Sequence, residues 1–184
     1  MSDIEKLHRE FLLSSGACTD TRKLLPNGMF FALRGPNFDA NVFAAEALKQ
    51  GCSYAVVDDP NVATDHRFIV VADVLNALQE LALHHRRTFD IPFIGITGSN
   101  GKTTTKELLY AVLSADRPTL ATTGNLNNHI GVPLTLLRLT QKHRIAIIEM
   151  GANKVGDIAE LTALAEPTHG MITNIGKAHL EGFG

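Results

Sequence analysis

Between residues 93 and 174, short apolar segments alternate regularly with segments of helical periodicity. The apolar segments are residues 93–97, 119–122, 145–149 and 170–174, and the helical segments between them are residues 102–113, 132–139 and 158–165. Short strands that are apolar on both faces and are joined by helices are typical of a parallel sheet covered on both sides. This half of the chain is therefore expected to form a doubly wound parallel α/β domain.

The first half of the chain predicts a smaller α/β domain. Ser2 and Glu5 have the spacing of a capping box in front of an amphipathic helix. A second helix is expected over residues 42–50, and a third follows Asp73 as its capping residue. Strands are expected at residues 29–33, 54–57 and 68–72.

The third helix of this domain ends in the run His84-His85-Arg86-Arg87. We interpret these cations as favourable to the helix C-terminus, rather than as a nucleic-acid patch. The segment Asp90-Ile91-Pro92 is interpreted as a hinge, so the predicted domains are residues 1–88 and 89–184. Because Gly184 comes soon after a strand, the second domain is expected to be incomplete at its C-terminus.

The charge balance excludes two classes of partner. The chain has 17 Lys and Arg residues against 19 Asp and Glu residues, a formal charge of −2, which gives no electrostatic reason to bind nucleic acid or an anionic membrane. No apolar run approaches the roughly 20 residues that span a bilayer. Cys18 and Cys52 are too few for a disulfide framework. We therefore expect a cytoplasmic protein without membrane insertion and without an obligate protein partner.

The strongest functional signal is the glycine-rich segment 95–105, with the sequence GITGSNGKTTT. It lies between a predicted strand and a predicted helix, which is the setting of a phosphate-binding loop. Backbone N–H groups attract phosphate oxygens in such a loop, Lys102 supplies a cation, and Thr103 offers a hydroxyl to Mg²⁺. The strict loop pattern requires glycine at position 96, where Ile96 stands, so a glycine-rich turn without a ligand is the alternative. The expected ATP- and phosphate-binding residues are Gly98, Ser99, Asn100, Gly101, Lys102, Thr103 and Thr104.

Polar residues follow two other strands of the predicted sheet. Glu149 ends one strand, and Asn174, Lys177 and His179 follow the next strand along the chain. The carboxyl ends of parallel strands meet at one edge of a sheet, where ligands bind. A carboxylate at that edge can hold Mg²⁺ directly or through water.

Taken together, these motifs resemble the Mur ligase family of ATP-dependent amide-forming enzymes, whose loop reads G-x-x-G-x-x-G-K-[ST]. The resemblance covers essentially the whole chain. Beyond the loop, it rests on residues 20–22, 31–35, 38–39, 122–139, 149–153 and 178–184.

The resemblance implies a reaction and its cofactors. ATP would phosphorylate the terminal carboxylate of UDP-N-acetylmuramoyl-tripeptide, and the amine of D-alanyl-D-alanine would attack the acyl phosphate, a step of peptidoglycan precursor synthesis. Lys102, Glu149 and His179 would be the catalytic residues. Thr103 and Glu149 would hold one Mg²⁺, and His179 with Glu149 would hold a second.

The resemblance also implies a substrate site in the first domain, which would bind the uridine nucleotide. The matching residues there are Thr21, Arg22, Arg34, Gly35 and Asp39, while Asn41 stands where many relatives have histidine. Asn127 and Asn128 of the second domain would steer the substrate, although they could instead stabilise the turn before the next helix.

Several alternatives are left open by the sequence. The run GNLNNHIGVP at residues 124–133 argues against the relative that adds the third peptide residue and against a folate-type polyglutamate ligase. A small-molecule kinase or a non-catalytic nucleotide-binding module would need no UDP-sugar-binding domain. Whether the third residue of the tripeptide is diaminopimelate or lysine is open. Because family segments that contact adenine and the dipeptide lie beyond the match to Gly184, this chain alone is expected to be inactive in ligation.

Overall fold

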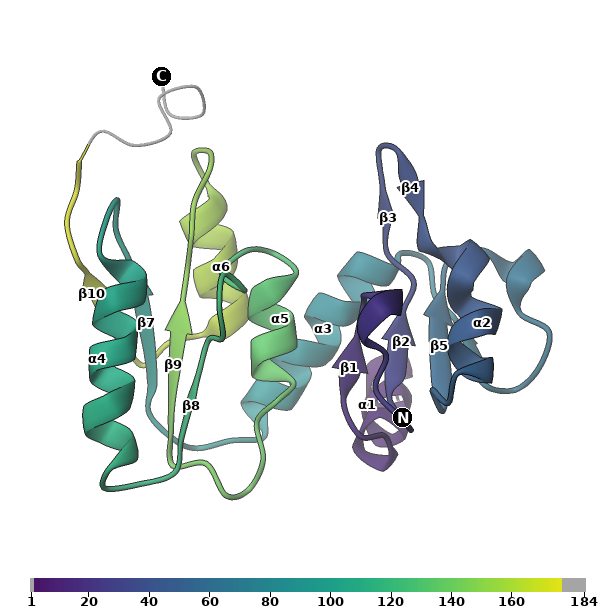
Figure 1. Cartoon of the computed structure of the whole chain (residues 1–184), viewed down its shortest axis with the longest axis horizontal. Coiled ribbons are helices and arrows are strands. Elements are labelled where there is room, and N and C mark those ends of the chain that lie inside the picture. The colour runs from purple at the N-terminus through teal and green to yellow at the C-terminus, as the bar shows by residue number, and fades with distance from the viewer. Residues whose placement is uncertain (1, 177–184) are drawn as a thin grey trace. The chain divides into compact units, whose positions relative to one another are not determined.

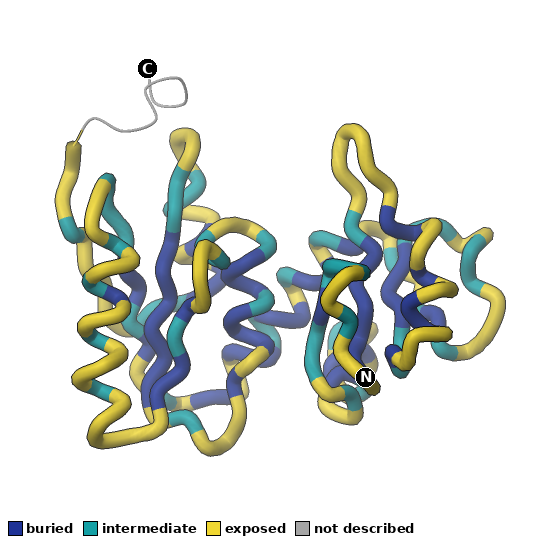
Figure 2. The backbone as a smooth tube through the Cα atoms, viewed as in Figure 1, coloured by how far each residue is buried: buried dark blue, intermediate teal, exposed yellow. Residues whose placement is uncertain are grey.

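The computed structural model describes residues 2–176, which form parts of two compact units, Met1–His84 and His85–Gly184. Figure 1 shows the helices and strands of each unit, and Figure 2 shows that the buried residues follow the sheets and the helix faces that cover them. Within the described residues, no helix is long and apolar enough to cross a membrane.

The first unit contains a four-stranded parallel sheet in the order β1-β2-β5-β6. Its strands are β1 (Ala17–Cys18), β2 (Met29–Phe31), β5 (Tyr54–Val57) and β6 (Phe68–Val70). The helices are α1 (Asp3–Leu13), α2 (Ala44–Lys49) and α3 (Val74–Arg87), with short 3₁₀ turns η1 (Thr21–Lys23), η2 (Ala40–Phe43) and η3 (Pro60–Val62). A small hairpin, β3 (Arg34–Gly35) and β4 (Phe38–Asp39), projects from the end of β2.

The second unit contains another four-stranded parallel sheet, in the order β10-β7-β9-β8. Its strands are β7 (Phe93–Thr97), β8 (Thr119–Ala121), β9 (Ile145–Glu149) and β10 (His169–Ile172), and its helices are α4 (Lys102–Ser114), α5 (Gly131–Leu136) and α6 (Asp157–Ala165). Helix α4 covers one face, where Leu109 and Leu113 pack on Ile96 and Ile147. On the other face, Gly95 leaves room for Met150 and for Pro167, which follows α6.

The predicted α/β architecture is confirmed, and strands β5, β7 and β9 have the predicted bounds. The two-residue strand β1 was not predicted, because two residues carry no alternation. The helix predicted at residues 42–50 begins instead as the 3₁₀ turn η2 at Ala40, since the Asp39 carboxylate accepts a hydrogen bond from the Asn41 backbone N–H and tightens the chain there.

The division between the units falls inside α3, between His84 and His85, rather than between residues 88 and 89. The last turn of α3, residues 85–87, belongs to the second unit and is bonded within it. A His85 ring nitrogen lies 3.1 Å from the Leu139 carbonyl oxygen, and Arg86 donates to the carbonyl oxygens of Ala165 and Glu166. Burial lowers the pKa of the Arg86 guanidinium. The run of cations therefore does more than favour a helix end, because two of its members are buried packing residues.

Candidate active site

The predicted phosphate loop connects β7 to α4 in a conformation that depends on glycine. Gly98 and Gly101 have φ angles of +133° and +79°, a region that side chains rarely adopt. At Gly98, a Cβ atom would also lie only 2.2 Å from the Thr173 hydroxyl oxygen. The loop is therefore held close to the segment that follows β10.

That neighbouring segment braces the loop through Asn174. The Ser99 N–H donates to the Asn174 carbonyl oxygen (3.1 Å), and the Asn100 N–H donates to its side-chain oxygen (2.9 Å). These two loop N–H groups are therefore engaged within the protein, although the sequence pattern assigned them to phosphate. The first intrahelical bond of α4 runs from Thr105 N–H to the Gly101 carbonyl, so the earlier N–H groups of α4 have no intrahelical acceptor. They are the donors available to an anion.

Lys102, at the start of α4, lies across the loop. Its ammonium nitrogen is 2.6 Å from the Gly98 carbonyl oxygen and 3.4 Å from that of Ser99. Its flexible four-carbon stem lets this cation leave the loop carbonyls and reach a bound anion. Thr104 lies in the same turn and is exposed.

Glu149, the last residue of β9, is the centre of the site. Its side chain is buried, with the residue 1% exposed, and one carboxylate oxygen accepts hydrogen bonds from the Thr103 hydroxyl (3.2 Å) and the Asn127 amide (2.9 Å). Among the described residues, its other oxygen, Oε2, is the buried side-chain polar atom without a hydrogen-bond partner. A buried carboxylate oxygen is costly without a partner, so this position favours a cation.

The donor set fits Mg²⁺. A carboxylate and a threonine hydroxyl are hard oxygen ligands, and Mg²⁺ in phosphate-transferring sites is held by few protein ligands together with water and phosphate oxygens. Residues 2–176 contain no cluster of three or more His, Cys, Asp or Glu side chains that could hold a metal ion. His179, predicted as a ligand of a second Mg²⁺, lies outside the described residues, as does Lys177.

Two residues that the sequence reading missed support Glu149. Lys106 is fully buried on α4, and its ammonium donates to the Thr122 carbonyl oxygen (2.8 Å) and pairs with Glu107. The Thr122 hydroxyl accepts the backbone N–H of Glu149 (2.9 Å). A signal existed, because Lys106 stands at helical spacing from Leu109 and Leu113 on the apolar stripe of α4.

The two candidate asparagines of the second unit separate in role. Asn127 joins the site through Glu149, and its backbone carbonyl accepts the Gly151 N–H (2.7 Å). The side-chain oxygen of Asn128 accepts the N–H groups of Ile130 (3.1 Å) and Gly131 (2.9 Å) at the start of α5. Asn128 therefore makes the contacts expected of a residue that stabilises the turn before α5, which was the alternative to a role in steering the substrate.

The predicted substrate residues of the first unit fall into two groups. Arg34 and Gly35 form β3, which pairs with Asp39 on β4, and the Arg34 Nε lies 3.4 Å from the Asp39 carboxylate. Thr21 and Arg22 lie on η1, where Arg22 is exposed and hydrogen-bonded to Asp20, which holds the pKa of that carboxyl at about 2. Within residues 2–84, no hydrogen bond or ion pair joins these two groups.

Comparisons with known proteins identify the family of this chain. The model of the Mur ligase middle domain matches residues 96–184. The UDP-N-acetylmuramoyl-tripeptide–D-alanyl-D-alanine ligase of Haemophilus influenzae is 48% identical over 170 residues, which are 90% of this chain and 37% of that protein. The same ligase of Bacillus subtilis is 43% identical, over 92% of this chain and 37% of that protein. This chain belongs to the Mur ligase family.

Solved structures of Mur ligases share the fold. MurF from Acinetobacter baumannii superposes with a TM-score of 0.84 and 38% identity, over 96% of this chain and 42% of that one. MurF ligase from Thermotoga maritima, solved in complex with ADP, has a TM-score of 0.80 and 33% identity, over 98% of this chain and 40% of that one. The chain therefore spans well under half the length of these Mur ligases.

Proposed function

We propose that this Mur ligase chain binds ATP and UDP-N-acetylmuramoyl-tripeptide for an ADP-forming amide ligation in peptidoglycan precursor synthesis, with D-alanyl-D-alanine as the second substrate. The observation that carries the proposal is the buried Glu149 carboxylate. Its oxygen Oε2 lacks a partner, and its oxygen Oε1 contacts Thr103 of the phosphate-loop helix. Phosphoryl transfer needs this combination of a phosphate cradle and a neighbouring carboxylate for the metal.

In this proposal, the chain's own residues act by position and charge. The N–H groups of the first turn of α4 hold the ATP phosphates, and the Lys102 ammonium swings from the loop carbonyls to the transferred phosphoryl group, where negative charge develops. The phosphoryl group passes to the tripeptide carboxylate, and ADP leaves. The D-alanyl-D-alanine amine then attacks the acyl phosphate, and inorganic phosphate leaves as the amide forms.

Thr103 and Glu149 would hold Mg²⁺ in this scheme, and the Asn127 amide would keep the carboxylate in place. Lys106 would act on the backbone of Glu149, through its hydrogen bond to Thr122. When bound, Mg²⁺ would neutralise charge between the phosphates and the acceptor carboxylate. The Asn127 amide orients Glu149 and keeps its hydrogen-bonded oxygen fixed. Asn174 keeps the loop in the shape that receives the phosphates.

The substrate assignment comes from the similar ligases of Haemophilus influenzae and Bacillus subtilis, whose name specifies the UDP-linked tripeptide and D-alanyl-D-alanine. In the first unit, the residues we assign to the UDP-linked substrate are Thr21, Arg22, Arg34, Gly35 and Asp39. The similarity covers 90% or more of this chain in both relatives, so it includes the first unit as well as the phosphate loop. A kinase or a simple nucleotide-binding module would not require that unit.

Two titrations of this chain test the proposal. Isothermal calorimetry is expected to detect binding of ATP only when Mg²⁺ is present, and binding of UDP-N-acetylmuramoyl-tripeptide with or without ATP. K102A should weaken the binding of ATP alone, and R34A should weaken the binding of UDP-N-acetylmuramoyl-tripeptide alone. Binding of ATP without any binding of the UDP-linked tripeptide would favour the kinase or binding-module alternative.

A further inference from the structure

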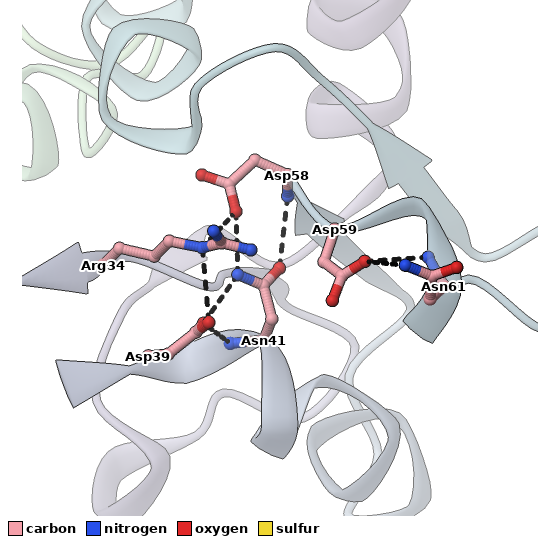
Figure 3. Close-up of polar contacts among 6 residues, drawn as sticks. All are labelled: Arg34, Asp39, Asn41, Asp58, Asp59 and Asn61. Carbon is pink, nitrogen blue, oxygen red and sulfur yellow. Dashed lines mark hydrogen bonds and ion pairs between the residues drawn. The ribbon is translucent and has the colours of Figure 1, made fainter.

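Asn41 is a buried amide in the first unit that sequence reading left without a role. It lies on η2 and is 2% exposed. Figure 3 shows it between two acidic residues that come from different parts of the chain. Its side-chain nitrogen donates to Asp39 (2.7 Å) and to Asp58 (2.7 Å), and its side-chain oxygen accepts the Asp58 backbone N–H (3.1 Å). Both donors of the amide are therefore used to hold two carboxylates together.

The same two carboxylates hold Arg34. Its Nε atom lies 2.8 Å from Asp58 Oδ1 and 3.4 Å from Asp39 Oδ2. Among residues 2–176, the terminal nitrogens of Arg34 make no hydrogen bond, and the side chain is 46% exposed. The guanidinium is thus held at its Nε atom by the two carboxylates, while nearly half of the side-chain surface stays exposed. Removing Asn41 would leave both carboxylates without their shared hydrogen-bond donor, and the Arg34 guanidinium could then change its orientation.

The charge of this group argues against a diphosphate as its ligand. One guanidinium and two carboxylates lie together, so the local formal charge is negative, and a diphosphate would be repelled. An exposed arginine beside a half-exposed Asp39 instead offers donors and acceptors side by side. The imide edge of uracil carries the matching acceptors and donor. The exposed rings of Phe38 and Phe43, stacked at 6.2 Å, add an apolar surface beside Asp39.

We propose that Asn41 is a positioning residue which, through Asp39 and Asp58, holds Arg34 for the uridine part of the UDP-linked substrate rather than for its diphosphate. This inference rests on the proposed function and adds to it two residues, Asn41 and Asp58, and the part of the substrate they serve.

The chain contains a matched control. Asn61 repeats the local geometry of Asn41, because its backbone and side-chain N–H groups both donate to Asp59 (2.9 and 2.8 Å) at the start of another 3₁₀ turn. Asn61 is exposed, and it has no contact with Arg34 (Figure 3). N61A thus removes the same local motif without the link to the arginine.

The experiment is a double-mutant cycle on the ¹⁵N-labelled chain, with uridine and UDP titrated separately by NMR. N41A and R34A are each expected to weaken both ligands by about tenfold, the loss of one hydrogen bond to a charged group. The double variant N41A/R34A should be no weaker than R34A, because Asn41 acts only through Arg34. N61A should bind like the parent. If N41A does not fold, D58N serves in its place, since it removes the carboxylate nearest to Arg34.

Several results would overturn the inference. Additive losses in N41A/R34A would mean that Asn41 has a merely structural role. A loss confined to UDP, with uridine unchanged, would assign Arg34 to the diphosphate. Parent-like binding by N41A, while the parent binds UDP-N-acetylmuramoyl-tripeptide, would refute the inference and leave the proposed function intact. Absence of any binding by the parent would refute both.

Discussion

The two parallel sheets of this chain place charged groups at the same kind of edge but satisfy them differently. In the first unit, Arg34 comes after β2 and Asp58 directly follows β5, and these strands are paired. In the second unit, the phosphate loop follows β7 and Glu149 ends β9, and these strands are also paired. Both sets therefore lie where carboxyl ends of parallel strands meet, the usual position of ligand sites.

The difference lies in which polar atoms are left over. The Asn41 amide has its two donors and its acceptor paired within the protein. The Glu149 carboxylate keeps one buried oxygen without a partner. A closed network fixes a geometry, whereas an open one costs stability until a ligand completes it. The edge of the first sheet therefore holds Arg34 in a fixed position, and the edge of the second sheet is suited to bind a cation.

The largest expected effect concerns Lys102, and it should separate the two edges. K102A removes a charge-assisted contact to phosphate and should weaken Mg-ATP binding by about 100-fold. Uridine binding by the first unit should stay unchanged. Calorimetry with both ligands measures this, and K142A, which removes an exposed lysine, is the control. Equal losses for ATP and uridine would mean that the two sites are not independent.

The next largest effect concerns the buried lysine behind the second edge. K106M should lower the free energy of unfolding by about 2 kcal/mol, because the buried Thr122 carbonyl loses its donor. Denaturant unfolding of parent and variant measures this. K154A, at an exposed lysine, should change stability by less than about 0.5 kcal/mol. An unchanged stability in K106M would show that the burial of Lys106 does not hold in solution.

A substitution of Glu149 tests whether its unpaired oxygen, Oε2, is a metal ligand. In E149Q, the gain in ATP affinity on adding Mg²⁺ should be about tenfold smaller than in the parent, because an amide is a poorer ligand for a hard cation. Without Mg²⁺, the variant should be at least as stable as the parent, since the unpaired buried charge is gone. Melting curves with and without Mg-ATP measure both effects. A parent-like Mg²⁺ dependence would contradict the ligand role.

The smallest effect concerns the proton equilibrium of Asp39. The Asn41 side chain, followed by its backbone N–H, lowers the pKa of this carboxyl below its ordinary value. A depressed folded-state pKa stabilises the protein above the unfolded pKa, and this contribution is lost as the pH falls through the folded pKa. N41A should raise the pKa of Asp39 toward normal in an NMR titration, whereas N61A should leave it unchanged. A normal pKa in the parent would argue against the network.

The sequence predicted the architecture and the loop because both depend on short-range patterns. Apolar runs mark strands buried on both faces, and the spacing of Gly98, Gly101 and Lys102 marks a phosphate loop. The supporting contacts were not predictable in this way. Asn41 meets Asp58 across 17 positions, and Lys106 meets Thr122 across 16. No local pattern records such pairs, and the same holds for the hydrogen bond from Arg86 to the Ala165 carbonyl oxygen, 79 positions away.

The Asn174 brace has a consequence for the thermodynamics of nucleotide binding. Since Ser99 and Asn100 are already bonded to Asn174, the loop loses its conformational freedom during folding rather than when a ligand arrives. Such preorganisation raises affinity by removing the entropic cost of ordering the loop at the moment of association. The affinity of the proposed site for phosphate would then be coupled to the pairing of β10 with β7. A substitution that weakens the pairing of β10 would therefore lower the affinity for the ligand, although it changes no residue that contacts the ligand.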